Sequence, residues 1–325
     1  MEENVFEQRI DLRELSFSVD AIRKEIGKVI VGQQEMVHML MIGILCDGHI
    51  LIEGVPGVAK TLTAKLMAKI IDADFSRIQF TPDLMPSDVL GTSVFNPKEA
   101  DFQFKRGPIF SNMILIDEIN RAPAKTQAAL FEVMEERQVT IDGTTHIMDF
   151  PFLVLATQNP IEQEGTYRLP EAQLDRFLFK IDVKYPTLEE EIRILLTQHA
   201  QSQNELLNEV HKILTTAQIT TFRQIIQKVL IEPKLVEFIA KIVNETRNTP
   251  SLFLGASPRA SLAILRASKA NAAIKGRDFV TPEDILEMAA PVMRHRIILT
   301  PEKEMEGITP DELIRNITSN IEVPR

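Results

Sequence analysis

The hydrophobic and polar positions of this 325-residue chain divide it into two parts. Up to about residue 186, short apolar runs alternate with amphipathic stretches of helical spacing. We expect strands at residues 50–53, 77–80, 113–117, 152–156 and 177–183, with helices between them. This alternation predicts an α/β fold in which helices cover both faces of a parallel five-stranded sheet.

Beyond Pro186 the apolar positions recur at helical spacing, and no further clear strands are expected. Thr281 and Pro282 mark one helix start, since Thr is a favourable cap and Pro suits the first helical position. We therefore divide the chain into a polar N-terminal segment, an α/β core and a small all-α domain, at residues 1–15, 16–186 and 187–325. Helices of the last part are expected at 188–198, 205–215, 222–243, 259–273 and 282–293.

Two pairs of short β-like runs interrupt the core. Residues 92–95 and 102–104 flank a turn-rich segment, as do residues 139–141 and 146–148. Each pair is expected to form a hairpin, so the core carries insertions near 92–104 and 139–148. These hairpins either cover an edge of the sheet or serve a function of their own.

The loop after the first strand carries the most specific motif. Residues 54–61 read Gly-Val-Pro-Gly-Val-Ala-Lys-Thr, between an apolar strand and a helix. Backbone N–H groups of such a loop surround phosphates, while Lys60 would reach the outer phosphates and Thr61 would ligate magnesium. The usual pattern has Gly before the Lys; Ala59 restricts the backbone there, but it tolerates helical dihedrals. An ordinary strand-to-helix turn is the alternative.

Polar side chains also end the next two predicted central strands. Asp117 and Glu118 follow four apolar residues, where unpaired carboxylates would be costly to bury. Asp117 could hold magnesium, and Glu118 could orient or deprotonate an attacking water. Asn159 could hydrogen-bond the terminal phosphate or that water, although Asn before Pro160 is also a common turn residue. Parallel sheets bind ligands at these carboxyl ends of strands.

These three motifs, in this order, resemble those of an AAA+ ATPase, and their wording is similar to the MoxR family. The likeness covers nearly the whole chain, and Ala59 fits that family's usual loop. The resemblance implies a P-loop core with a helical lid over the nucleotide, and hairpins that point toward the central channel of a ring. It is carried by residues 31–33, 54–61, 102–110, 116–123, 156–160, 169–177 and 255–260.

The resemblance also implies roles for residues outside the three motifs. Arg176 matches the arginine finger that reaches a neighbouring subunit's ATP, and Arg259 matches a second-sensor arginine that detects the third phosphate. A surface ion pair of Arg176 with Asp175 or Glu171 is the alternative. The expected contacts with ATP are Val31, Gly32, Gly54, Val55, Pro56, Gly57, Val58, Ala59, Lys60, Thr61, Leu62 and Arg259. Mg²⁺ is expected at Thr61 and Asp117, and Glu118, Asn159 and Arg176 are expected to be catalytic.

Composition narrows the function further. The net charge of −10 disfavours a general nucleic-acid binder, and the single cysteine excludes an intrachain disulfide. No apolar run is long enough to span a bilayer and no secretory signal is evident, so a cytoplasmic location is expected.

By resemblance, the chain is expected to be a ring-forming, hexameric, chaperone-like ATPase. It would remodel protein clients, with a von Willebrand A domain protein as a partner in trans. The alternatives are a magnesium-chelatase-like motor subunit and a nucleotide-controlled binding switch with little turnover.

Overall fold

The computed structural model describes residues 10–55, 57–158, 169–201 and 203–324. Pro56 and Asn159, two of the expected site residues, lie outside these ranges. Among the described residues, no helix combines the length and the apolarity that crossing a lipid bilayer requires.

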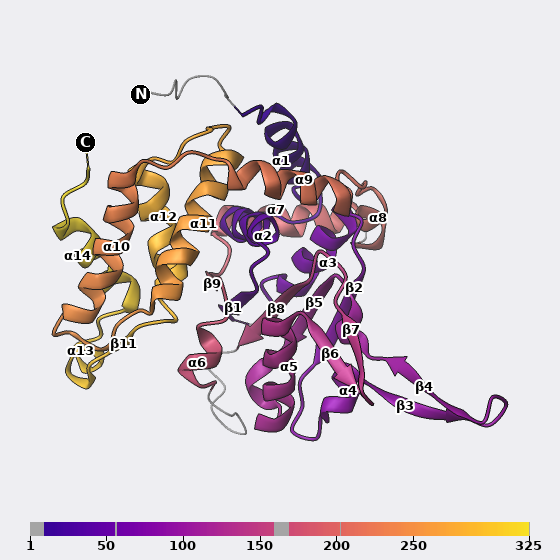
Figure 1. Ribbon diagram of the computed structural model, residues 1–325. Coiled ribbons are helices and arrows are strands. Elements are labelled where there is room, and N and C mark those ends of the chain that lie inside the picture. The colour runs from indigo at the N-terminus through magenta and orange to yellow at the C-terminus, as the bar shows by residue number, and fades with distance from the viewer. Residues whose placement is uncertain (1–9, 56, 159–168, 202, 325) are drawn as a thin grey trace, which may run out of the picture.

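A five-stranded parallel sheet forms the centre of the first part (Figure 1). Its strand order is β2-β5-β8-β1-β9. The predicted parallel sheet is confirmed, and strand ends differ from the expected ones by two residues or fewer. The strands are β1 (Ile50–Gly54), β2 (Phe75–Gln79), β5 (Met113–Asp117), β8 (Leu153–Gln158) and β9 (Phe179–Val183).

Helices follow the strands of the first part and fill most of the second (Figure 1). The first part contains α1 (Arg13–Ile26), α2 (Gln34–Cys46), α3 (Lys60–Ile70), α4 (Pro86–Leu90), α5 (Ala124–Glu136), α6 (Glu171–Leu174) and the short 3₁₀ helices η1 (Pro108–Phe110) and η2 (Ile119–Arg121). The second contains α7 (Leu188–Ala200), α8 (Gln203–Asn208), α9 (Thr216–Gln227), α10 (Pro233–Asn248), α11 (Pro258–Ile274), α12 (Pro282–Met293), α13 (Pro301–Met305) and α14 (Pro310–Asn320).

Successive side chains of the strands enter two different hydrophobic cores, because they point to opposite faces of the sheet. Ile50 and Ile52 belong to a core that includes α2 and α3 and continues into α9, α10, α11 and α12. Leu51, between them, joins the other core, which contains Leu130 and Phe131 of α5. The helical part is therefore packed on one face of the sheet through a shared core.

Both predicted hairpins form. They are β3 (Gly91–Asn96) with β4 (Asp101–Arg106) and β6 (Gln138–Ile141) with β7 (Thr144–Ile147). In the described chain neither hairpin joins the five-stranded sheet, so the interpretation that they cover its edge is wrong. The first hairpin projects from the body of the molecule as a narrow arm (Figure 1).

Three expectations for the second part were wrong. The helix expected at 222–243 is two helices, because the chain is extended before Pro233, a residue that favours a helix start over a helix interior. The helix expected at 205–215 ends at Asn208, and Ile213 N–H donates instead to the Ile70 carbonyl at 2.8 Å. Two short strands, β10 (Leu252–Leu254) and β11 (Ile298–Leu299), also pair antiparallel within this otherwise helical part.

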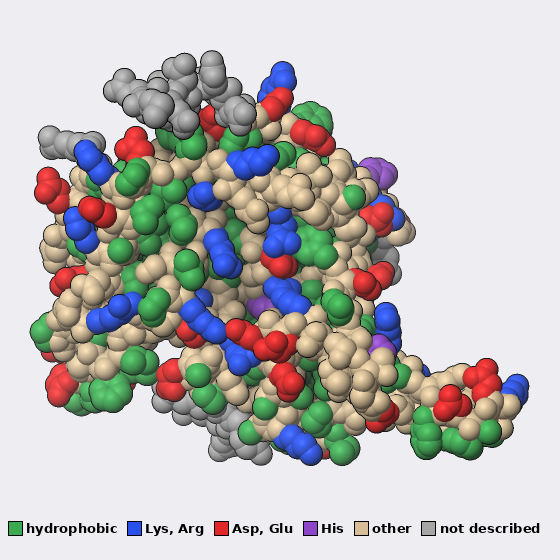
Figure 2. All heavy atoms as spheres, viewed as in Figure 1, with side chains coloured by type: hydrophobic (Ala, Val, Ile, Leu, Met, Phe, Trp, Pro, Cys, Tyr) green, Lys and Arg blue, Asp and Glu red, His purple; other side chains and the backbone are tan. Residues whose placement is uncertain are grey.

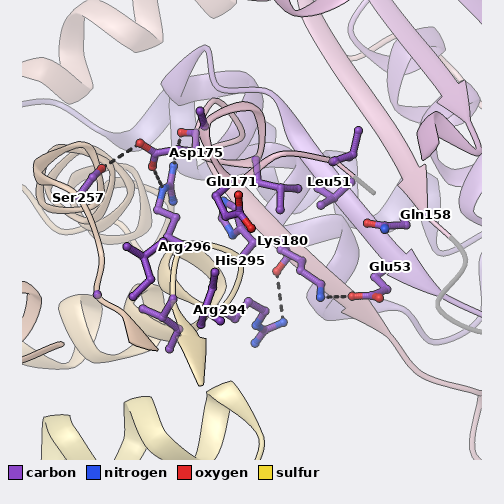
Figure 3. A pocket seen from close by; sticks show the side chains of 17 residues that line it. Leu51, Glu53, Gln158, Glu171, Asp175, Lys180, Ser257, Arg294, His295 and Arg296 are labelled. Carbon is purple, nitrogen blue, oxygen red and sulfur yellow. Dashed lines mark hydrogen bonds and ion pairs between the residues drawn. The ribbon is translucent and has the colours of Figure 1, made fainter. Parts of the chain in front are cut away.

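Figure 3 shows the junction cavity, a space of about 390 Å³ where the sheet meets the helical part. Arg296 is buried here, with its Nε 2.7 Å from Asp175 Oδ1. The Ser257 hydroxyl donates to Asp175 Oδ2 at 2.9 Å. Since Ser257 caps α11, the Asp175 carboxylate joins the start of α11 to the end of α6 and to Arg296.

A second buried carboxylate organises the helical part. Asp284 is fully buried, and both its oxygens lie 2.7 Å from the Arg277 guanidinium. Burial alone would raise the pKa of this carboxyl, but hydrogen bonds from Arg277 and Thr281 lower it. Its folded-state stabilisation is therefore complete above the ordinary carboxyl pKa and is lost as the pH falls below it.

We expect Asp284→Ala to destabilise the protein by about 3 kcal/mol at pH 7, because it leaves Arg277 without its buried partner. The measurement is the midpoint of urea unfolding, followed by circular dichroism. Glu245→Ala, which removes an exposed carboxylate from α10, is the control and should change stability by less than about 0.5 kcal/mol. Equal losses in the two variants would contradict this role for Asp284.

Candidate functional site

The expected phosphate loop lines a cavity of about 400 Å³ at the carboxyl ends of β1, β5 and β8. Lys60 begins α3, and its ammonium donates to the Gly54 carbonyl at 2.7 Å. Burial lowers the pKa of Lys60, while the nearby Asp117 raises it. The cavity therefore contains a partly desolvated cation opposite a carboxylate. Its other loop residues are Gly57, Val58, Ala59, Thr61 and Leu62.

Among the described residues of the loop, the backbone is left-handed at Gly57 and Ala59. Gly57 has a φ of 86°, and a Cβ built there would meet nothing within 4 Å, so only backbone geometry favours Gly. Ala59 has a φ of 59°, which differs from the helical dihedrals expected for it. This conformation costs a non-glycine residue about 1 kcal/mol, and such strain is commonest at functional sites. Ala59 is the N-cap residue of α3, the last residue before the helix begins.

Asp117 lies at the floor of the cavity and is buried. Its Oδ1 accepts from the Thr157 hydroxyl at 3.1 Å, and its Oδ2 lies 2.6 Å from Arg77 Nε. Thr61 lines the same cavity. A hydroxyl and a carboxylate are oxygen ligands of the kind that Mg²⁺ prefers, so the residues present fit this ion.

Glu118 follows at the rim, with a left-handed φ of 59°. Its Oε2 accepts from Gln79 Nε2 at 2.9 Å and lies 3.0 Å from Arg121 Nε. The Glu118 N–H donates to the Thr157 hydroxyl at 3.1 Å. The side chain that is expected to act on water is therefore held by two neighbours in this structure.

Sequence reasoning missed Arg77, Gln79 and Thr157, which all line this cavity. Arg77 and Gln79 are two residues apart on β2, so they point to the same side. Arg77 meets Asp117 at the end of the paired strand β5, and Gln79 meets Glu118 just beyond it. The sequence did contain a signal for Arg77 and Gln79. They are polar residues at alternate positions of the strand that pairs with the strand ending in Asp117.

Val31, Gly32 and Val55, which were also expected to contact ATP, are not among the described residues that line this cavity. Gly32 is beside α7, where a Cβ would lie 2.7 Å from Glu190 Oε1. The next residue, Gln33, donates from Nε2 to the Lys184 carbonyl at 3.3 Å.

The two expected arginines line a different cavity, of about 350 Å³, which we call the arginine cavity. Figure 2 shows Lys and Arg side chains gathered around a hollow in the middle of one face of the molecule. The described lining contains five arginines and three carboxylates, so it has a net positive charge. The arginines are Arg137, Arg176, Arg259, Arg266 and Arg296, and the carboxylates are Asp47, Glu135 and Asp175.

Arg176 and Arg259 share a partner in this cavity. Arg259 Nη2 lies 2.8 Å from Glu135 Oε1, and Arg176 Nε lies 3.9 Å from Glu135 Oε2. Arg176 also donates to the Phe131 carbonyl. The alternative in which Asp175 pairs with Arg176 is wrong, because Asp175 instead binds Arg296 and Ser257.

Helix α5 separates the arginine cavity from the phosphate loop. It begins just after η2, which directly follows Glu118, and Glu135 lies in its last turn. Its 13 residues span about 20 Å at 1.5 Å per residue. The arginine cavity therefore lies at the far end of α5 from Glu118, which lines the cavity around Lys60.

Comparison with known proteins assigns the family. A model of the ATPase family associated with various cellular activities (AAA) matches residues 49–179, and an AAA lid domain model matches residues 244–317. The protein named Chaperone MoxR1 from Mycobacterium tuberculosis is 43% identical over 310 residues, covering 93% of this chain and 81% of that protein. The chain belongs to the MoxR family of AAA+ ATPases.

Two further matches extend over nearly the whole chain. The uncharacterised protein YeaC from Bacillus subtilis is 45% identical and covers 93% of both chains. A crystal structure of a Cytophaga hutchinsonii protein has a TM-score of 0.88 and 46% identity, over 96% of this chain and 97% of that one. A magnesium-chelatase subunit homolog from Methanocaldococcus jannaschii is more distant, at 28% identity over 58% of this chain. The family therefore accounts for both the sheet and the helical lid.

Proposed function

We propose that this chain binds ATP with Mg²⁺ in the cavity around Lys60 and hydrolyses it within a homo-oligomeric ring. Arg176 and Arg259 would act on the ATP of a neighbouring subunit. The observation that supports this arrangement is their place in a separate cavity, at the end of α5 that is remote from Glu118 and the cavity around Lys60. The family resemblance favours a hexamer, and we retain a cytoplasmic location as part of the proposal.

The proposal gives a role to each of the site residues. The backbone of the loop and Lys60 would bind the phosphates, while Thr61 and Asp117 would hold the ion that neutralises their charge. Glu118 would take the proton of the attacking water once it leaves Gln79 and Arg121. Asn159, outside the described residues, would position that water, and Val31 and Gly32 would contact the adenine.

Lys60→Ala tests the binding step. We expect it to weaken ATP binding by at least about tenfold, because it removes a charge-assisted contact to phosphate. The measurement is titration calorimetry with ATP and Mg²⁺. Lys65→Ala, on the same helix but not among the residues lining the cavity, is the matched control and should bind as the unaltered chain does. Equal affinity of all three proteins would contradict the assigned site.

We further propose that ATP turnover remodels partner proteins, one of which carries a von Willebrand A domain. The surface of the β3–β4 hairpin supports the proposal that the client is a protein. Phe95 and Phe102 are exposed and contact each other with ring centroids 5.4 Å apart. The hairpin carries hydrophobic side chains along the projecting arm (Figure 2). Exposed apolar side chains of this kind commonly mark protein contacts.

Affinity capture with Glu118→Gln under ATP tests this partner proposal. A chain that binds ATP without hydrolysing it should retain its clients, so mass spectrometry of the captured proteins should identify a von Willebrand A domain protein. Capture with Lys60→Ala is the control and should recover less of it. Recovery of no such protein with either variant would count against this partner.

A nucleotide-controlled switch with little turnover is the second candidate. The observation in its favour is that Gln79 and Arg121 hold Glu118 away from reaction in this structure. Phosphate release measured over a range of protein concentrations separates the two candidates. A rate that stays negligible at high concentration would favour the switch.

A further inference from the structure

Glu135, in the last turn of α5, joins the two arginines on which the proposed function depends. One of its carboxylate oxygens lies 2.8 Å from Arg259 Nη2, and the other lies 3.9 Å from Arg176 Nε. The sheet part supplies Glu135 and Arg176, whereas Arg259 belongs to α11 of the lid. One anion thus contacts a guanidinium group from each part.

A carboxylate between two guanidinium groups has the charge and the acceptor atoms that these groups would also find in a phosphate. Glu135 therefore occupies the side of the arginines that a neighbouring subunit's terminal phosphate would need. We propose that Glu135 is a positioning residue that holds Arg176 and Arg259 while the neighbour's site is empty, and that a bound triphosphate displaces it. This inference rests on the proposed function of the two arginines in trans.

The ion pair between Glu135 and Arg259 is exposed enough for a phosphate to displace the Glu135 carboxylate. The side chains of Arg259 and Glu135 are 51% and 38% exposed, so their ion pair is solvent-screened and contributes little to stability. The Asp175–Arg296 pair next to it is different, since Arg296 is only 3% exposed. The buried pair fixes the backbone beside Arg176, and the exposed pair fixes only where the guanidinium groups point.

The backbone of α5 is anchored at both ends, which confines the exchange to side chains. Near its start, Gln127 Nε2 donates to the carbonyls of Ile119 and Ala122 at 3.1 Å. Just beyond its end, Arg137 Nη2 donates to the Asp47 carbonyl at 2.8 Å. Rotation of the Glu135 side chain is therefore enough to free Arg259 from its ion pair, while Arg176 keeps its hydrogen bond to the Phe131 carbonyl.

A mixture of two inactive variants tests this proposal. The donor chain carries Lys60→Ala, so it binds its own ATP much more weakly but keeps its arginines. The acceptor chain carries Arg176→Ala, so it binds ATP but cannot activate a neighbour. Phosphate release from the mixture then reports only donor arginines that act on acceptor ATP.

We expect Glu135→Gln in the donor chain to raise phosphate release at subsaturating ATP by about two- to fivefold, the scale of one exposed ion pair. The same change in the acceptor chain should leave the rate unaltered, because the arginines beside it no longer form the active pair. Glu136→Gln in the donor, which neutralises the adjacent exposed carboxylate, is the matched control and should have no effect.

The test depends on which of the two chains carries Glu135→Gln when the rate changes. A purely structural role for Glu135 would change the rate equally from either chain, and that result would overturn the proposal. An unchanged or slower reaction with the altered donor would overturn it as well. A mixture that releases no phosphate at all would instead reject the trans arginines themselves, and the Glu135 proposal with them.

Discussion

Glu118→Gln should bind ATP with the affinity of the unaltered chain and hydrolyse it about 10²- to 10⁴-fold more slowly. The amide has nearly the same shape as the carboxylate, so it can still lie between Gln79 and Arg121. It cannot take a proton from water, however. Loss of the base should therefore stop the chemical step and leave the proposed contacts of Lys60 with phosphate and of Thr61 with Mg²⁺ intact.

Two measurements check this expectation separately. Titration calorimetry with ATP and Mg²⁺ gives the affinity, and a phosphate-release assay gives the rate. Glu132→Gln, an exposed carboxylate on α5, is the control and should hydrolyse ATP at the unaltered rate. Hydrolysis by Glu118→Gln at that same rate would show that Glu118 is not the base.

The central strands could be predicted from sequence because β1, β5 and β8 each combine an apolar run with a motif at the carboxyl end. Strand β5 is buried along its whole length and ends in Asp117. Its apolar pattern predicted a strand, and its acidic end predicted a functional site. The first hairpin was equally clear, since its two strands pair in full register around a turn of polar residues. Local patterns of this kind need no knowledge of distant contacts.

Contacts between distant segments could not be predicted in the same way. Glu135 carries no motif, and only the tertiary fold brings Arg259, at the start of α11, to it. Arg296 is likewise 121 residues from its partner Asp175. The sequence alone did not show which partner each of these charged residues would take.

The same limit explains the incorrect helix at 222–243. The apolar spacing continues across residues 228–232, so periodicity alone favours one long helix. In the structure, Leu230 instead forms a bridge with Phe279, and its N–H donates to the Asp278 carbonyl at 2.9 Å. This tertiary pairing, together with Pro233, ends one helix and starts another.

Arg176→Ala should reduce ATP turnover by about 10³-fold or more, because a guanidinium on the transferring phosphate stabilises the charge of the transition state. The substitution also removes a hydrogen bond to the Phe131 carbonyl, which contributes about 1 kcal/mol to stability. That cost is small enough for the variant to fold, and circular dichroism can verify it. Affinity for ATP should stay the same, since Arg176 lies outside the cavity around Lys60.

The dependence on protein concentration separates action in trans from action within one chain. Turnover per chain of the unaltered protein should rise with concentration as neighbours assemble, whereas that of Arg176→Ala should stay low throughout. Arg315→Ala, at an exposed arginine of α14, is the control and should follow the unaltered curve. Turnover that is the same at every dilution would contradict action in trans, because the arginine would then have to reach the phosphate of its own chain across the length of α5.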